Sequence, residues 1–349
     1  MNVATLTLNP CIDKTLYFNT SFRTDGLNRA AYSVTSAGGK GINVARIYRK
    51  LGIRVQALGF AGGTTGDMLR ALLAKEDIQT NFVETLCDTR MCIKLIDAAG
   101  ACTEANECGG PIQEEEYKAL KAQLVSTAQA CSSAQACSSA HSSNVEEDII
   151  LFAGGSIPNG LPDDTYKQLI TELSSPGSGH PGTGRAGTGK LRFILDADGA
   201  ALREGITASP WLIKPNCAEL SGLVGYEITG RTALEKAENA AKASRRIHAQ
   251  YGTNVLCTLG GDGAVYTNAD GAYYVNAPHV TMRGFTGAGD TFLASFVFAY
   301  EKNGSDVESA LCFASSAAAA KVELAGTEMP DKQAMMRFAE KVQAEKLSI

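Results

Sequence analysis

Short apolar runs alternate with longer stretches of helical periodicity along most of the chain. The apolar runs are rich in Val, Ile, Leu and Phe, which is typical of buried β-strands. The predicted strands are 3–8, 55–60, 148–152, 192–195, 211–213 and 254–258. The predicted helices are 43–51, 67–76, 233–251, 291–300 and 307–324. This alternation predicts a largely parallel sheet with helices on both faces, and ligands in such folds bind at the carboxyl ends of the strands.

Three further segments have a different pattern: residues 17–22, 31–35 and 90–97 are β-rich, partly alternating and not followed by helices. They are expected to form a small accessory sheet, and such a sheet would make a natural lid. We expect its strands to come from about residues 12–36 and 88–110, within one α/β domain that spans residues 1–349.

Two segments interrupt the regular pattern. The first, residues 126–146, contains the hexamer QACSSA twice in tandem, and the second, residues 174–190, is rich in Gly, Ser, Thr and Pro. Both are interpreted as loop insertions without a functional role. The second contains GRAGTGK at 184–190, which fits the first seven positions of a P-loop. Leu191 then replaces the Ser or Thr that would hold magnesium, and a strand follows where a helix should, so a P-loop is not expected.

Composition excludes several classes of function. The formal net charge is −5, and no segment concentrates Lys and Arg into a nucleic-acid track. No apolar run reaches the roughly 18–20 residues that a membrane span needs, and the N-terminus does not resemble a signal peptide. Ten cysteines are scattered without zinc-site spacing and are interpreted as reduced thiols. We therefore expect a cytoplasmic protein that binds small molecules, with neither nucleic acid nor membrane as a partner.

A glycine-rich loop, GFTGAGDTF at 284–292, directly precedes a predicted helix. Small residues before a helix expose backbone N–H groups and the positive end of the helix dipole, which bind anions. Asp290 carries a negative charge at the same place. A base that deprotonates a hydroxyl, next to N–H groups that hold a phosphoryl group, accounts for this combination. The alternative is a helix cap, because Asp and Gly are common at helix starts.

A second glycine-rich segment, AGGKGINVAR at 37–46, also precedes a helix. Its glycines allow a ligand to approach the backbone, Lys40 offers a positive charge, and Asn43 offers both a donor and an acceptor. The alternative is a glycine-rich turn that leads into a helix.

Polar residues follow several of the predicted strands. Asp13 lies just past the first strand, where a carboxylate can accept hydrogen bonds from two sugar hydroxyls or serve as a turn residue. Arg90 opens the segment 90–97 and could clamp a phosphate or be a solvated edge-strand charge, and Arg29 is a weaker candidate of the same kind. The segments 214–219 (KPNCAE) and 258–263 (TLGGDG) each follow a strand and suit the phosphates and ribose of a nucleotide, the first together with hydrated magnesium.

Taken together, these elements resemble the PfkB branch of the ribokinase family. GGKGINVAR at 38–46 is similar to its N-terminal signature and GAGDTF at 287–292 to its C-terminal one. TLNPCIDKTL (7–16), TRMCIKL (89–95), GSIPNG (155–160) and KPNCAEL (214–220) resemble the 1-phosphofructokinase and tagatose-6-phosphate kinase subgroup most. The resemblance covers almost the whole chain except the two insertions. It implies a ribokinase-like three-layer α/β/α sandwich with a small β-sheet lid that often also forms a dimer contact.

The resemblance also implies a role for each candidate residue. Asp290 would be the general base, and Gly287, Ala288 and Gly289 would form the anion hole. Substrate binding would involve Asp13, Gly38, Gly39, Lys40, Asn43 and Arg90, with the sugar's own phosphate held by Lys40 and Arg90. ATP would be bound by Lys214, Asn216, Thr258, Gly260 and Gly263, and Glu219 would organise Mg²⁺ through water. Where many relatives carry Asp, Asn or Ser followed by Thr or Pro, this chain has Gly284 and Phe285.

The leading hypothesis is an ATP-dependent kinase that converts fructose 1-phosphate to fructose 1,6-bisphosphate. A tagatose-6-phosphate kinase is the alternative nearest to it. A kinase of an unphosphorylated sugar fits less well, because Lys40 and Arg90 would then bring unneeded positive charge to the pocket. A non-catalytic sugar-phosphate sensor on the same fold is a further alternative, although a sensor has no need of a base at position 290.

Overall fold

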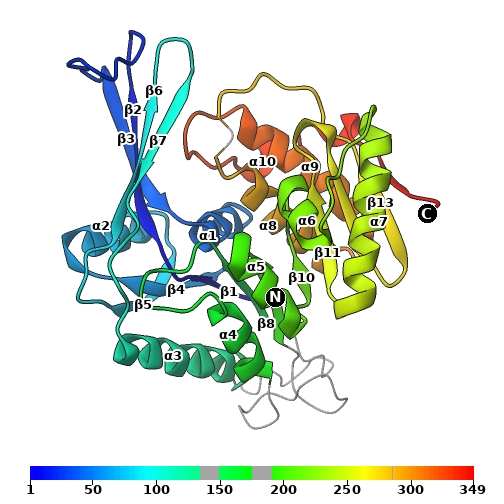
Figure 1. Cartoon of the computed structure of the whole chain (residues 1–349), viewed down its shortest axis with the longest axis horizontal. Coiled ribbons are helices and arrows are strands. Elements are labelled where there is room, and N and C mark those ends of the chain that lie inside the picture. Colours follow the sequence, from blue (N-terminus) through cyan, green and yellow to red (C-terminus); the bar gives the residue numbers. More distant parts are fainter. Residues whose placement is uncertain (134–148, 175–190, 285) are drawn as a thin grey trace.

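The computed structural model describes residues 1–133, 149–174, 191–284 and 286–349 (Figure 1). Within these residues a 10-stranded sheet has the order β14-β13-β12-β11-β10-β9-β8-β1-β4-β5. Its strands are β1 (Asn2–Thr7), β4 (Val55–Ala61), β5 (Gln79–Glu84), β8 (Ile149–Gly154), β9 (Leu191–Asp196), β10 (Leu212–Ile213), β11 (Asn254–Thr258), β12 (Ala264–Asn268), β13 (Gly271–Val275) and β14 (Ala344–Lys346). In this spatial order, each pair of neighbours from β11 through β10, β9, β8, β1 and β4 to β5 is parallel. At the other end of the sheet, β12, β13 and β14 are added in antiparallel pairs. The predicted largely parallel sheet is therefore confirmed.

Helices cover both faces of this sheet, and each face has its own buried apolar cluster. One face carries α1 (Lys40–Lys50), α2 (Gly63–Lys75), α8 (Ala288–Lys302), α9 (Val307–Val322) and α10 (Lys332–Met336). The other carries α3 (Glu114–Ser133), α4 (Thr165–Ser174), α5 (Gly199–Gly205), α6 (Cys217–Val224) and α7 (Ala233–Tyr251). Because the strands are buried on both faces, they read as continuous apolar runs rather than alternating ones. The result is a three-layer α/β/α sandwich.

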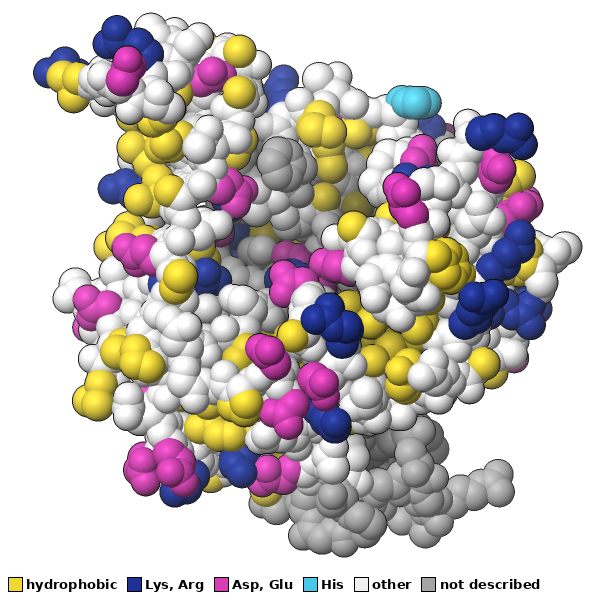
Figure 2. Space-filling view, viewed as in Figure 1, with side chains coloured by type: hydrophobic (Ala, Val, Ile, Leu, Met, Phe, Trp, Pro, Cys, Tyr) yellow, Lys and Arg dark blue, Asp and Glu magenta, His cyan; other side chains and the backbone are white. Residues whose placement is uncertain are grey.

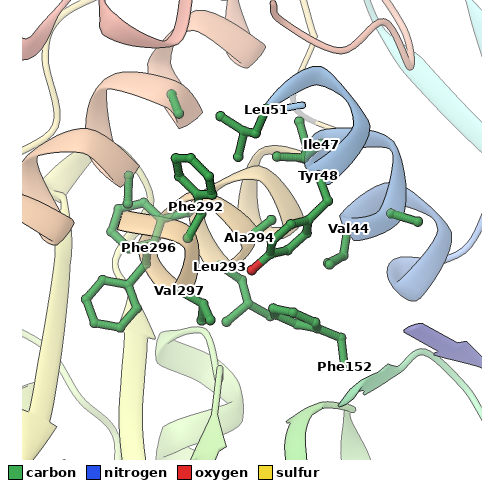
Figure 3. Packing of buried hydrophobic residues seen from close by; sticks show 14 of the residues in the cluster. Val44, Ile47, Tyr48, Leu51, Phe152, Phe292, Leu293, Ala294, Phe296 and Val297 are labelled. Atoms are coloured by element: carbon green, nitrogen blue, oxygen red, sulfur yellow. The ribbon is translucent and has the colours of Figure 1, made fainter. Parts of the chain in front are cut away.

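Helices α1 and α8 pack directly against each other and fix the position of both glycine-rich segments. Figure 3 shows Tyr48 and Val44 of α1 beside Leu293 and Ala294 of α8, with Phe152 of β8 below them. Tyr48 and Phe152 have ring centroids 5.4 Å apart. Burying large side chains of this kind contributes about 1.5–3 kcal/mol each. This packing holds the first turns of the two helices side by side although they lie far apart in the sequence.

A separate 4-stranded sheet, with the order β3-β2-β6-β7, projects from the body as the lid (Figure 1). It consists of β2 (Cys11–Tyr17), β3 (Tyr32–Gly38), β6 (Arg90–Ile96) and β7 (Cys102–Asn106). β2 pairs antiparallel with β3 and parallel with β6, and Cys11 lies opposite both Gly38 and Arg90. β2 follows β1 closely, and β3 ends where α1 begins. The base of the lid therefore lies at the carboxyl end of the first strand.

Several element boundaries differ from those predicted. The expected strand 17–22 is wrong, because the strand is Cys11–Tyr17, and the aromatic residues beyond it pack on each other instead of pairing: the rings of Phe18 and Phe22 meet edge to face. α8 begins at Ala288 rather than 291, which places Asp290 inside the first helical turn. α3 extends through residues 126–133 of the first expected insertion. The rest of that insertion and residues 175–190, which include the P-loop-like segment 184–190, lie outside the described residues.

None of the helices in the described part of the chain combines the length and the apolar character that crossing a membrane would require.

Candidate active site

The two glycine-rich segments meet at Asn43 and Asp290. Asn43 lies in the first turn of α1 and donates from Nδ2 to Asp290 Oδ2 over 2.7 Å. Both side chains are buried. Gly39 precedes α1 with a φ of 121°, a conformation that glycine adopts without strain. The structure therefore brings together two residues that the sequence placed in separate motifs.

Asp290 does not cap its own helix. The N-cap of α8 is Gly287, and no side chain caps this helix start. Burial raises the pKa of Asp290 to about 6, and the nearby Asp196 carboxylate adds to the rise, whereas Lys214 and the hydrogen bond from Asn43 oppose it. The helix start is therefore capped by glycine, and Asp290 is not a capping side chain. A carboxylate with a pKa near neutrality is suited to accept a proton from a hydroxyl.

The predicted anion hole, Gly287 to Gly289, forms the start of α8 and is called the cradle here. Gly287 has a φ of 82°, which again requires glycine-like freedom. A β-carbon at Gly289 would lie 3.4 Å from Lys214 Nζ, so a lysine ammonium lies beside Gly289. Backbone N–H groups at a helix start and an adjacent ammonium are groups of the kind that bind negative charge, which is what the sequence predicts for this segment.

Asp196 holds two of the predicted lysines together, and sequence reasoning did not single it out. Its carboxylate contacts Lys40 Nζ at 2.8 Å and Lys214 Nζ at 3.1 Å. Burial works to raise the pKa of Asp196, but the two ammonium groups outweigh this effect and hold the pKa below its usual value. The signal available in the sequence was its position, because Asp196 ends β9 at the same sheet edge as the other site residues.

Lys40 and Arg90 were expected to hold the same phosphate, but they contact different parts of the site. Burial works to lower the pKa of Lys40, yet Asp196 raises it overall, and Asp290 contributes in the same direction. The Arg90 guanidinium donates to the main-chain oxygens of Asn9 and Glu107 at the base of the lid. Lys40 therefore lies at the cradle end of the site and Arg90 at the lid end.

Asp13 lies within β2 of the lid, where its carboxylate accepts from Lys94 Nζ over 3.2 Å. Both side chains are buried, and Lys94 was also missed by sequence reasoning. Lys94 occupies the second position after Cys92 on β6, and Cys92 lies opposite Asp13. The backbone of Gly38 packs directly against the Asp13 carboxylate, because a β-carbon at position 38 would lie only 2.4 Å from Asp13 Oδ2. The lid thus contributes a carboxylate and an ammonium next to the glycine segment.

The predicted nucleotide residues gather at the ends of β10 and β11. Asn216 and Thr258 lie side by side through a parallel β-bridge. Asn216 caps α6, and its side chain accepts from Glu219 N while the Glu219 carboxylate accepts from Asn216 N. Gly260 and Gly263 form the turn after β11 with φ values of 67° and 98°. The Thr258 N–H donates to the carbonyl of Pro215, the residue after Lys214. These nucleotide candidates therefore lie close to Lys214 at the edge of the sheet.

The surface is hollowed between the lid and the body, with acidic and basic side chains at the floor of the hollow (Figure 2). The hollow lies between the lid and the part of the body that carries α8, α9 and α6 in Figure 1. A ligand could therefore bind between the lid sheet and the carboxyl edge of the main sheet.

Comparison with known proteins agrees with this geometry. The family model described as pfkB family carbohydrate kinase matches residues 6–334. A 1-phosphofructokinase of Bacillus subtilis is 32% identical over 300 residues, which cover 86% of this chain and 86% of that protein. A tagatose-6-phosphate kinase of Staphylococcus epidermidis is 29% identical over 294 residues, which cover 84% of this chain and 83% of that protein.

Solved structures show the same similarity along the whole chain. Phosphofructokinase-2 from Escherichia coli in complex with potassium aligns with a TM-score of 0.81 at 26% identity, over 97% of this chain and 98% of that one. A buried carboxylate beside a helix-start anion site, a lid over the sheet edge and a family match over most of the chain all agree. The chain therefore belongs to the pfkB family of carbohydrate kinases and is a sugar kinase.

Proposed function

We propose that this chain transfers the γ-phosphoryl group of ATP to the C6 hydroxyl of fructose 1-phosphate and so forms fructose 1,6-bisphosphate. The family implies ATP as the phosphoryl donor. The relatives named 1-phosphofructokinase favour this acceptor. In the reaction, Asp290 takes the hydroxyl proton and the sugar oxygen bonds to the γ-phosphorus. The bond from that phosphorus to the β–γ bridging oxygen breaks, and ADP leaves with its electron pair.

The observation that carries this proposal is the arrangement of Asp290, Asn43 and Lys214 around the cradle. The carboxylate has a pKa of about 6, so most molecules hold it deprotonated at neutral pH. Asn43 fixes one of its oxygens, and this leaves the other available to a hydroxyl. The ammonium of Lys214 lies beside Gly289. A base and a site for negative charge therefore adjoin each other, as in-line phosphoryl transfer requires.

We assign the two ends of the hollow to the two ends of the sugar phosphate. Asp13, Gly38, Gly39 and Asn43 would hold the sugar hydroxyls, because they surround the junction between the lid and α1. Arg90 would bind the phosphate that the sugar already carries, since its guanidinium lies at the base of the lid. Lys40 pairs with Asp196 beside Lys214, which supports a role at the transferring phosphoryl group rather than at the sugar's own phosphate.

The nucleotide would lie along the ends of β10 and β11, against Lys214, Asn216, Thr258, Gly260 and Gly263. Mg²⁺ accompanies ATP in this proposal and would supply positive charge to its phosphates. The oxygen atoms of Glu219 and Asn216 are of the type that Mg²⁺ prefers, and both groups are already engaged in the cap of α6. Glu219 would therefore act through water, as expected from the sequence.

The lid offers a surface for a homodimer. Its strand β3 and the loop before it expose large apolar side chains, with Tyr32 58% exposed, Val34 40% exposed and Leu27 68% exposed. Apolar side chains grouped in this way favour contact with a second copy. Light scattering coupled to gel filtration would detect the dimer, and Tyr32→Asp combined with Val34→Asp should shift it to a monomer.

A coupled assay of ADP release tests the proposed reaction. Purified protein would be given Mg²⁺–ATP with fructose 1-phosphate, tagatose 6-phosphate, fructose 6-phosphate or fructose. We expect the highest kcat/KM with fructose 1-phosphate. Higher kcat/KM with tagatose 6-phosphate would reassign the substrate to the alternative that the Staphylococcus epidermidis relative supports. Turnover restricted to fructose would contradict the role of Arg90.

The sensor alternative gives a different result in the same experiment. A sensor would show no ADP release with any sugar phosphate, while thermal unfolding would still shift upward when the sugar phosphate is added. The Arg90→Met variant is the matched test of phosphate binding. It should raise KM for fructose 1-phosphate with little change in kcat, because the sugar's own phosphate does not react.

A further inference from the structure

Lys321 is a fully buried lysine that the proposed reaction does not use. It lies in the last turn of α9, and its ammonium Nζ donates to Gly326 O over 2.9 Å. Its partner is thus a main-chain carbonyl. Lysine is rarely buried completely, because the ammonium loses its hydration, so this placement calls for a physical reason.

The side chain of Lys321 lies next to Gly287, the first residue of the cradle. A β-carbon at Gly287 would lie 3.6 Å from Lys321 Cε and 3.8 Å from Asn43 Nδ2. Gly287 is the N-cap of α8 and the first residue of the cradle. The lysine therefore contacts Gly287, which lies three residues before Asp290 in the chain.

Two chain segments meet next to this lysine: residues 283–284, which precede the cradle, and the turn 323–328 after α9. Val322 O accepts from Arg283 N at 2.9 Å and from Gly284 N at 3.1 Å. A β-carbon at Gly284 would lie 2.8 Å from Leu324 O. The segments are packed so closely that position 284 has no room for a side chain. This accounts for a glycine where the family resemblance leads one to expect Asp, Asn or Ser.

The same turn is also connected to the lid and to α1. Arg46 Nη1 donates to Thr327 O over 2.9 Å, and the hydroxyls of Ser36 and Thr327 lie 2.6 Å apart. A change in the position of the turn 323–328 would therefore move its contacts to the residues before the cradle, to α1 and to β3 of the lid at the same time.

We propose that the Lys321 ammonium serves as a built-in monovalent cation, which binds the carbonyl of Gly326 and holds the turn 323–328 against the cradle. In this proposal the ammonium, bound to the carbonyl of Gly326 beside the cradle, takes the place that a bound K⁺ ion would have, and the chain supplies it covalently. Catalysis then requires no free monovalent cation. This inference rests on the phosphoryl transfer proposed above, and Lys321 is a positioning residue in it.

The charge of this lysine depends on pH. Burial lowers the pKa of Lys321 to about 8, and Arg46 of α1 and Lys94 of β6 act in the same direction. Glu328 of the turn and Asp290 of α8 act against them. The Tyr17 hydroxyl also faces the turn, at 3.0 Å from a β-carbon placed on Gly326. The ammonium is therefore mostly protonated at pH 7 and loses its proton above about pH 8, so kcat/KM should decline there.

The test compares the wild type with Lys321→Ala and Lys321→Met in KCl, NaCl and tetramethylammonium chloride at equal ionic strength. The wild type should have the same kcat in all three salts. Lys321→Ala should lose about 100-fold in kcat in tetramethylammonium chloride, with KM for the sugar phosphate little changed, because a small displacement of a catalytic group has an effect of that size. Ammonium, methylammonium or K⁺ should restore much of the loss by entering the space vacated.

Lys321→Met fills most of that space without a charge, so it should lose kcat, resist rescue by cations and lack the alkaline decline. Lys302→Ala, which removes an exposed lysine from the end of α8, is the matched control and should behave as the wild type. Thermal unfolding would establish that each variant is folded.

Three results would overturn the inference: K⁺ activation of the wild type, retention of kcat in folded Lys321→Ala, or a loss in that variant that no cation restores. Should neither variant fold, the salt comparison of the wild type decides alone.

Should the wild type transfer no phosphoryl group, the proposed function fails separately. The lysine is then tested by the thermal shift that Mg²⁺–ATP produces: cation rescue of the shift in Lys321→Ala supports its role, and an unchanged shift refutes it.

Discussion

Helices α6 and α8 both start beside the site with an acid at the third helical position, Glu219 in α6 and Asp290 in α8. In α6 the N-cap is Asn216, and the acid and the N-cap satisfy each other's backbone N–H groups. In α8 the N-cap is Gly287, and the acid bonds to Asn43 of another helix. The same position therefore carries an acid that caps its own helix in α6, and in α8 an acid that is bonded to another helix and that we propose as the base.

The difference comes from what occupies the N-cap. A capping side chain accepts a hydrogen bond from one of the free N–H groups of a helix start and stabilises the helix. Glycine at the N-cap leaves those groups available to an external anion, and the acid is then free to bond elsewhere. Burial then raises the pKa of Asp290. The α8 start thus lacks the stabilisation of a side-chain cap, and under the proposed function it provides a base and an anion site instead.

Replacing Asp290 by Asn should have the largest effect on activity. Without a base, kcat should fall by about a thousandfold. The free energy of unfolding should stay the same or rise, because a buried charge near Asp196 is removed. The coupled assay and thermal unfolding of the same preparation measure both quantities. A near-normal kcat would show that Asp290 is not the base, and a large loss of stability would restore the capping interpretation.

The pH profile of the wild type should show the titration of Asp290. Its pKa is raised to about 6, so the carboxylate gains a proton as the pH falls through that value, and kcat/KM should then fall about tenfold per pH unit. Measuring initial rates from pH 5 to 8 in buffers of constant ionic strength tests this. A profile that stays flat below pH 6 would contradict the assignment.

Removing the hydrogen bond from Asn43 should move that profile. The bond lowers the pKa of Asp290, so Asn43→Ala should raise the pKa and shift the acidic decline of kcat/KM to higher pH. The loss of activity should be greater at pH 6 than at pH 8. A double-mutant cycle with Asp290→Asn provides the control, because in that background the pH-dependent part of the effect should vanish.

The acid of α6 should give the smallest effects. Glu219→Gln keeps an oxygen that can accept from Asn216 N, so the free energy of unfolding should change by less than about 0.5 kcal/mol. Glu219→Ala loses the capping box and should lower that free energy by about 1 kcal/mol. Both variants should need more Mg²⁺ for half-maximal rate, since both lack the charge. An unchanged Mg²⁺ requirement would restrict Glu219 to its structural role.

The local patterns predicted the body of the molecule well. The strand 254–258 and the helix 233–251 match the structure, because each has a continuous pattern with clear ends: Thr232 and Gly252 cap the helix, and Gly252 and Gly260 flank the strand. The first lid strand was misplaced, since its position depends on pairing with β3 and β6, which are distant in sequence. Phe285, where the chain departs from its family's pattern, lies outside the described residues.

The sequence alone determined most of the candidate residues: two glycine-rich helix starts, a base candidate and polar residues after strands. Only the tertiary structure decided how they act together. It joined Asn43 to Asp290, placed Asp196 between Lys40 and Lys214, and buried Lys321 next to Gly287 of the cradle. A motif records local backbone preference, whereas a pKa and an ion pair depend on burial and on charges brought close by packing.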